Sequence, residues 1–189
     1  GTYSDRRIYK FTIIDEIPKG VKQETSGMDF GVSPDPTFLV DLYTSKANLY
    51  LDERFCETGL MPERIKGAER FCISDKMEEI GFKKGWPIGC DSSGATEIKD
   101  LKKHGYNAKG VAKGTGSVID GIKKVKAYNI HVTKRSENLI KHFESWFWKV
   151  DHNGNIIAEP QGHEPDGLAA TRYGVMGMKR STRVGISAG

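Results

Sequence analysis

The stretch that most restricts the fold runs from Ser26 to Cys56 and reads SGMDFGVSPDPTFLVDLYTSKANLYLDERFC. It contains three apolar segments of strand length, and turn-forming residues separate them in GVSPDP and in TSKAN. Connections this short join antiparallel neighbours, because parallel strands need a crossover of about a dozen residues or more. Side chains alternate along a strand, so Phe38, Val40 and Leu42 share one face of the second segment. The sequence therefore predicts an antiparallel meander of three strands.

After Met61 the hydrophobic period changes, and helical patterns alternate with short strand patterns. The expected helices span residues 61–82, 92–105, 116–127 and 136–148, and a last helix begins between His163 and Asp166. The expected strands span residues 86–91, 106–111 and 128–132, and the Asn-Gly pair within 148–160 predicts a hairpin or tight turn. Ser92 and Ser93 are placed to cap the second helix. This order predicts an α/β fold, in which the meander and parallel crossover strands form one mixed β-sheet flanked by helices.

The composition is that of a globular protein with one domain, or at most one and a half. The 189 residues are 37% hydrophobic and 29% charged, and no apolar run approaches the length that crosses a membrane. The N-terminal residues show no signal-peptide pattern and no starting Met, so we expect a fragment of a longer protein. Cys56, Cys72 and Cys90 form no CxxC pair, which argues against a disulfide framework and a structural zinc site and fits a reducing compartment. We expect these thiols to be free and buried.

Positive charge is concentrated in one part of the chain. The net charge is +4, and residues 99–149 carry twelve Lys or Arg against four Asp or Glu. Such a local basic field favours polyanionic partners, although a lysine-rich face can also serve solubility alone. The aromatic run Trp146, Phe147 and Trp148 falls at a helix end, where we expect core packing.

Three acidic residues lie at the ends of expected elements. Asp29 sits within an apolar strand, where a carboxylate is costly unless it is paired or bound to a metal. Asp91 ends a strand, and Asp166 lies in the first turn of the last helix. Each has a structural alternative: a hydrogen bond to a turn amide for Asp29, a helix cap for Asp91, and favourable interaction with the helix dipole for Asp166.

Taken together, the three acids indicate a metal site. Ligands of α/β sheets gather at strand ends where the topology switches, and Asp29 and Asp91 end strands that could be neighbours. Carboxylates that converge without a cation repel one another, and a hard divalent cation such as magnesium relieves that repulsion. Two such ions about 3.5–4 Å apart can activate water and stabilise the leaving oxygen of a phosphodiester.

The order and spacing of several motifs resemble one family. These are DFG followed by a further acid, the meander, CDSS, KGTGSVIDGI, and a His-x-x-Asp that leads into GLAATRYG. From Val21 to Met176 the chain is similar to the nuclease domain of the large terminase subunit of tailed bacteriophages, especially its PBSX-like branch. The resemblance implies the RNase H-like fold. The chain departs from the family at DGLAATRYG, where extra residues precede Arg172 and Tyr173, although Asp166 stays in place.

The resemblance also implies the site residues and the chemistry. Asp29, Asp91 and Asp166 match the family's metal-binding acids, with Asp29 bridging two Mg²⁺ or Mn²⁺ ions. His163 matches a histidine that precedes the last acid in some members, as a ligand or a proton carrier, and Asp35 matches a further acid that follows the first. Two alternatives stay open for Glu164: a second metal ligand, or an exposed residue of the first helical turn.

The implied function is a metal-dependent endonuclease that cuts concatemeric double-stranded DNA during phage genome packaging, in the cytoplasm of the host bacterium. The implied partners are DNA, an ATPase domain of the same polypeptide, the portal protein and the small terminase subunit. We expect residues 1–20 to be an extension from the ATPase domain, 21–178 to be the nuclease domain, and 179–189 to be a basic tail.

The glycine-rich loop around Lys113 lacks the Gly-Lys-Ser/Thr ending of a Walker A motif, so we exclude a nucleotide-binding loop. Lys109 and Lys113 are instead expected to meet DNA phosphates, with solvation alone as the alternative, and such contacts would make binding insensitive to sequence and sensitive to salt. Two other functions stay open at this point. One is another RNase H-like nuclease of the resolvase or transposase type, and the other is a non-catalytic DNA-binding module.

Overall fold

A computed structural model describes residues 6–112 and 116–179. The strands and helices follow in the order β1 (Phe11–Ile14), β2 (Lys22–Asp29), β3 (Thr37–Ser45), β4 (Asn48–Glu57), α2 (Ile73–Glu79), β5 (Pro87–Asp91), α3 (Ala95–Lys103), β6 (Asn107–Val111), α4 (Ser117–Lys126), β7 (Asn129–Thr133), α5 (Glu137–Ser145), β8 (Trp148–Val150), β9 (Ile156–Pro160) and α6 (Asp166–Met176). None of the described helices is long and apolar enough to cross a membrane.

Seven strands form one mixed sheet in the order β1-β7-β4-β3-β2-β5-β6, and β8 and β9 form a separate hairpin. Strands β2, β3 and β4 are antiparallel neighbours, as the meander predicts. Strands β5, β6, β7 and β1 add in parallel, β5 beside β2 and β7 beside β4. The predicted α/β fold, with a mixed sheet of an antiparallel meander and parallel strands flanked by helices, is confirmed.

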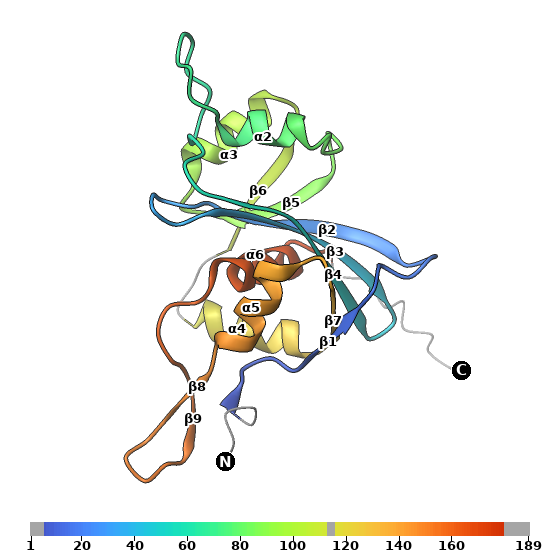
Figure 1. Cartoon of the computed structure of the whole chain (residues 1–189), viewed down its shortest axis with the longest axis vertical. Helices are drawn as coiled ribbons and strands as arrows, with labels where there is room; N and C mark the ends of the chain where they lie inside the picture. The colour runs from blue at the N-terminus through green and yellow to red at the C-terminus, as the bar shows by residue number, and fades with distance from the viewer. Residues whose placement is uncertain (1–5, 113–115, 180–189) are drawn as a thin grey trace, which may run out of the picture.

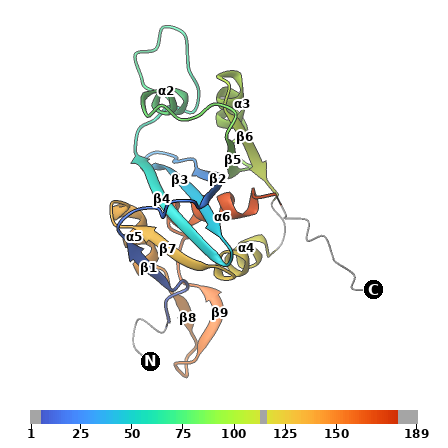
Figure 2. The same cartoon turned by 90° about the vertical axis from the view of Figure 1, so that its right-hand side faces the viewer.

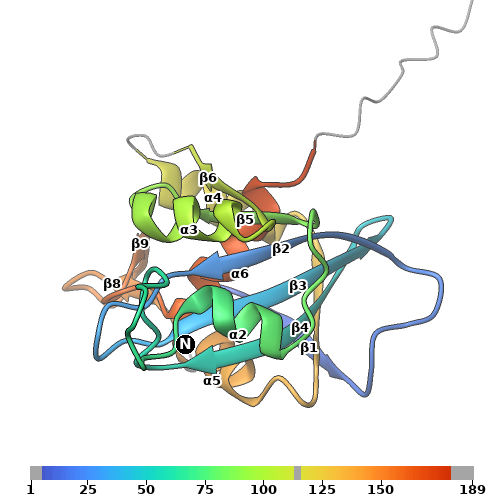
Figure 3. The same cartoon turned by 90° about the horizontal axis from the view of Figure 1, so that it is seen from above.

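Helices cover both faces of this sheet and form two cores (Figure 1). Alternation along β3 divides its side chains between them: Phe38, Val40 and Leu42 pack with α4, α5 and α6, whereas Leu39 packs with α2 and α3 on the other side. Figures 2 and 3 show the same layers from the side and from above, with the β8–β9 hairpin projecting from the body of the molecule. Of the aromatic run, Trp146 is buried in the first core as expected, whereas Trp148 is only half-buried on the hairpin.

Helix α6 lies unusually close to the centre of the sheet. Gly27 of β2 pairs with Gly89 of β5, and both face the backbone of α6. A Cβ on Gly27 would lie 1.8 Å from the carbonyl oxygen of Ala170, and one on Gly89 would lie 2.2 Å from that of Tyr173. Each glycine stands two residues before an acid, so this close approach fixes α6 relative to the strand ends that carry Asp29 and Asp91.

The Gly27→Ala substitution should therefore destabilise the protein. The new methyl group meets helix backbone, which cannot rotate away as a side chain can, so α6 has to shift. We expect a loss of about 3 kcal/mol or more in the free energy of unfolding, at the upper end of overpacking costs. Urea unfolding measures it. Gly59→Ala is the control, since its Cβ meets nothing within 4 Å and only its φ of +79° opposes alanine; equal losses for the two variants would contradict the close approach.

Three local expectations need correction. Residues 62–70 form turns and bends, because Gly67 has a φ of +80° and the segment is mostly exposed, so the predicted helix begins only at Ile73 with Cys72 as its N-cap. The N-cap of α3 is Gly94 without a side-chain hydrogen bond, since Ser93 bonds to Asp91 instead. Part of the segment expected to be an extension, Phe11–Ile14, pairs with β7 as the edge strand β1. The assignment of residues 21–178 as the nuclease domain and of the tail remains a prediction, and residues 180–189 lie outside the described residues.

Candidate active site

The topology brings the three predicted acids together. Asp29 and Asp91 are the last residues of β2 and β5, which are parallel neighbours with Met28 opposite Cys90. Asp166 is the first residue of α6, the helix that rests on Gly27 and Gly89. All three acids are half-buried. Neighbouring strand ends and one helix end thus converge at one edge of the sheet, as the sequence predicts.

Asp29 and Asp166 form a coupled pair of carboxyls. The pKa of Asp29 is raised to about 8, mainly by burial and also by the charges of Asp166, Asp91 and Glu164 and a hydrogen bond to Asp166. Burial also raises the pKa of Asp166, and nearby Asp35 adds to that increase. The dominant charges around Asp29 are therefore all negative. Asp41 and Asp52, two other buried acids, are instead paired with Arg54 and Arg135.

Asp91 is held by its own turn and by α6. Its Oδ1 accepts hydrogen bonds from the backbone N–H of Ser93 at 2.8 Å and from the Ser93 hydroxyl at 2.9 Å. Its Oδ2 accepts one from the Tyr173 hydroxyl at 3.2 Å. Burial, Asp29 and Asp91 all raise the pKa of Tyr173, so this phenol stays a neutral donor. Asp91 therefore closes a turn with Ser93 and does not cap α3, and its negative charge acts on Asp29.

The start of α6 is positioned by His142 of α5. The Nδ1 of His142 accepts a hydrogen bond from the backbone N–H of Gly167 at 3.0 Å, directly after Asp166. Burial lowers the pKa of His142, which favours the neutral ring that such acceptance requires. The ring also packs against Phe38, with centroids 5.4 Å apart. His142 thereby satisfies one of the free N–H groups of this helix N-terminus.

Glu164 is neither a free ligand nor an exposed residue of the first helical turn. Its carboxylate accepts two hydrogen bonds from Arg172, one from Nη2 at 2.7 Å and one from Nε at 2.9 Å. The side chains are only 13% and 6% exposed. The exposed alternative for Glu164 is thus wrong, and a largely buried ion pair ties the segment before α6 to the helix itself.

The remaining predicted site residues lie around this centre. Asp35 is exposed on the β2–β3 loop, close enough to Asp166 to affect its pKa. His163 is exposed, and its ring makes no hydrogen bond to any described residue. Lys109 is exposed on β6, the edge strand beside β5. Lys113 lies outside the described residues.

Carboxylate oxygens at this edge are the ligand type that hard divalent cations prefer. Within residues 6–112 and 116–179, no three His, Cys, Asp or Glu side chains are already arranged as a metal site. The mutual repulsion around Asp29 is nevertheless the condition that a bound cation would relieve, so the donor set fits magnesium or manganese.

Metal-free protein should become more stable to heat when Asp29 is replaced by asparagine, and the gain should grow with pH. The pKa of Asp29 in the folded protein is about 8 against an ordinary value of 3.8. A group whose pKa is raised by folding stabilises the folded protein fully at pH values below its pKa in the unfolded chain. This stabilisation is lost as pH rises through its pKa in the folded protein. Wild-type protein should thus lose stability between about pH 4 and pH 8, whereas asparagine does not ionise.

Thermal unfolding in chelator across that pH range measures the difference. Added Mn²⁺ should then raise the melting temperature of the wild type more than that of Asp29→Asn, because a ligand that binds only the folded state stabilises it by mass action. Equal manganese shifts for both proteins would contradict a role for Asp29 in metal binding.

Comparisons with known proteins support the fold described above. No protein-family model matches the chain. The PBSX phage terminase large subunit of Bacillus subtilis (strain 168) is 27% identical over 151 residues, which cover 78% of this chain and 33% of that protein. The chain therefore spans about a third of the length of this curated relative.

Similarity to solved structures identifies the fold of this chain. The nuclease domain of the g2p large terminase from bacteriophage SPP1, crystallised with bound Mn, superposes with a TM-score of 0.72 at 24% identity and covers 89% of this chain and 97% of that one. The chain has the fold of a large-terminase nuclease domain. The P22 large terminase nuclease domain gives a TM-score of 0.63 at 18% identity over 90% of this chain and 91% of that one. The magnesium-bound terminase nuclease of phage G20c gives 0.57 at 12% identity, over 90% and 96%. The resemblance to terminase nuclease domains that the sequence motifs indicate is confirmed.

Proposed function

We propose that this domain is the metal-dependent endodeoxyribonuclease of a phage packaging terminase and cleaves double-stranded DNA. The observation that carries the proposal is the convergence of Asp29, Asp91 and Asp166 on one edge of a terminase-nuclease fold, where the charges of other described residues that shift the pKa of Asp29 are all negative. Structures with this fold have been crystallised with Mn or magnesium, which supports divalent cations as cofactors.

Two divalent cations would supply a water nucleophile and stabilise the charge that develops on the leaving oxygen. Asp29, Asp91 and Asp166 would hold these ions, and the charges of both other acids already act on Asp29. Tyr173 and the Ser93 turn orient Asp91 through three hydrogen bonds, and His142 holds the turn that begins with Asp166. Asp35 would contribute negative charge near Asp166, and His163, which is exposed three residues before Asp166, would serve in proton transfer. The products would be a 3′-hydroxyl and a 5′-phosphate.

DNA would be held through its phosphates. Lys109 is exposed on β6, and β6 pairs with β5, the strand that ends at Asp91. Lys113 follows along the same segment, and we keep it as a second expected phosphate contact. Lysine is a flexible point charge, so binding should depend on salt and little on sequence.

The wider role follows from the curated relative, whose length the chain covers only in part. We propose that the domain works beside an ATPase domain of the same polypeptide in the cytoplasm of an infected bacterium. There it would meet the portal protein and the small terminase subunit and cut concatemeric DNA.

The direct test is incubation of supercoiled plasmid with the protein and Mn²⁺, Mg²⁺, Ca²⁺ or a chelator. Manganese and magnesium should give nicked and then linear plasmid, and the chelator should abolish both products. Calcium should support binding with little cleavage. Equal cutting in chelator would exclude the metal mechanism, and strong preference for a four-way junction over plasmid would favour a resolvase-type nuclease. DNA binding without cleavage in any metal would identify a non-catalytic module.

A further inference from the structure

A basic and aromatic groove lies away from the three acids. Two adjoining cavities, of about 360 Å³ and about 550 Å³, share Lys126 of α4 and Trp148 of β8. The groove runs from α4 past the first residues of β1 and β7. These strands are parallel to β2 and β5, whose last residues are the acids, so the groove and the acids lie at opposite strand ends of the sheet.

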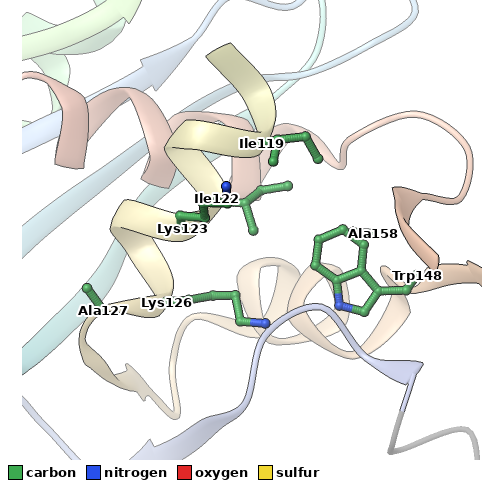
Figure 4. A pocket seen from close by; sticks show the side chains of 7 residues that line it. All are labelled: Ile119, Ile122, Lys123, Lys126, Ala127, Trp148 and Ala158. Carbon is green, nitrogen blue, oxygen red and sulfur yellow. The ribbon is translucent and has the colours of Figure 1, made fainter. Parts of the chain in front are cut away.

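The smaller cavity has an apolar floor. Ile119 and Ile122 of α4 face Trp148 and Ala158 of the hairpin across it, as Figure 4 shows. Its volume falls within the roughly 300–1,000 Å³ of ordinary ligand pockets. Val150 and Ile156, which pair across the same hairpin, are 41% and 47% exposed and extend the apolar surface nearby. The cavity can therefore take an apolar side chain.

The rim of the groove is positively charged. Lys123 and Lys126 line the smaller cavity, and Arg7 and Lys10 line the larger one. No carboxylate occurs among the described residues that line either cavity. The Nε of Arg7 is buried without a hydrogen-bond partner among the described residues. The ammonium of Lys126 lies 5.4 Å from the centre of the Trp148 ring, and Lys126 is exposed.

We infer that this groove binds an acidic peptide segment of a partner protein, one in which an apolar side chain is flanked by carboxylates. The lining residues of both cavities carry positive charge and no carboxylate, which complements a negatively charged occupant, and the apolar floor complements an apolar side chain. Duplex DNA meets only the first requirement, because its backbone offers phosphates and no apolar group to fill a cavity of this size. An acidic peptide meets both, with aromatic and aliphatic anchors of the kind that dominate protein interfaces.

Fluorescence anisotropy with a labelled synthetic peptide tests this inference. The probe contains a Leu-Phe pair flanked on both sides by aspartates and glutamates, and a second probe has Gly-Gly in place of the apolar pair. The first peptide should bind the whole chain, and binding should weaken by about tenfold, or about 1.4 kcal/mol, in Lys126→Ser and in Lys123→Ser. Lys124→Ser is the matched control, since Lys124 lies in the same last turn of α4 and does not line the groove.

Each outcome decides the inference. Weakening by Lys126→Ser and Lys123→Ser but not by Lys124→Ser, together with weaker binding of the Gly-Gly probe, supports an acidic peptide site. Absence of binding, equal effects of all three substitutions, or equal affinity for both probes overturns it. Displacement of the peptide by a charge-matched DNA duplex at the same ionic strength also overturns it, because the groove would then be a nucleic-acid surface. Circular dichroism of each variant establishes that its fold is intact.

Discussion

Asparagine in place of Asp29, Asp91 or Asp166 is expected to lower metal-dependent DNA cleavage by roughly 100- to 10,000-fold. Asparagine keeps the size of the side chain and removes its charge, so the strand and helix ends should stay in place. A divalent cation at such a site contributes several kcal/mol to the transition state, and about 1.36 kcal/mol corresponds to a factor of ten in rate. Single-turnover cleavage of a labelled duplex in Mn²⁺ measures the loss.

Asp29→Asn should have the largest effect of the three, because the charges of both other acids raise the pKa of Asp29. His163→Ala and Asp35→Asn should be milder, since both side chains are exposed and water can replace either one. Asp120→Asn is the control, as Asp120 is an exposed acid in the first turn of α4. Near wild-type cleavage by Asp91→Asn would mean that Asp91 only completes its turn with Ser93.

The sheet could be predicted from the sequence because the residue patterns that determine it lie within single strands and the turns between them. Strands β3 and β4 are apolar segments of strand length, and the turns between the meander strands are too short for a crossover. The error at residues 61–72 has a local cause as well. Ile65 and Ala68 have helical spacing, yet both are exposed, since Gly67 turns the chain and leaves no helix to bury them.

The acids were predictable for a different reason. Each acid lies at one end of a strand or helix, and the order of the strands places β5 beside β2. A further signal was present in the sequence, because Gly27-Met28-Asp29 and Gly89-Cys90-Asp91 repeat one pattern at both strand ends. A glycine within a strand marks close approach of another backbone, and here that backbone belongs to α6.

The residues that support the acids could not be predicted in this way. His142 precedes Gly167 by 25 positions, and their hydrogen bond depends on how α5 packs against α6. Tyr173 reaches Asp91 only because α6 lies flat on Gly89. Such contacts follow from tertiary packing, and no spacing rule within one element reveals them.

Arg172→Ala is expected to cost about 3–5 kcal/mol in the free energy of unfolding, because it leaves the carboxylate of Glu164 buried without its partner. The Glu164 side chain is 13% exposed. Its carboxylate accepts hydrogen bonds from Nε and Nη2 of the Arg172 guanidinium in a bidentate arrangement. Arg172→Lys should recover only part of the loss, since an ammonium group cannot make the same two bonds. Urea unfolding at neutral pH measures each value.

The double variant Glu164→Gln/Arg172→Met should be more stable than Arg172→Ala, because it removes the buried charge along with its partner and keeps much of the volume. The long side chain at position 172 has room because Gly121 of α4 faces it. A Cβ on Gly121 would lie 2.5 Å from the Cδ of Arg172. Lys149→Ala is the control, since Lys149 pairs with Glu159 on the hairpin with both side chains well exposed, and such pairs contribute about 0–1 kcal/mol. If Arg172→Ala costs no more than this control, the ion pair does not anchor the start of α6, and the position of Asp166 depends on His142 and the two strand glycines alone.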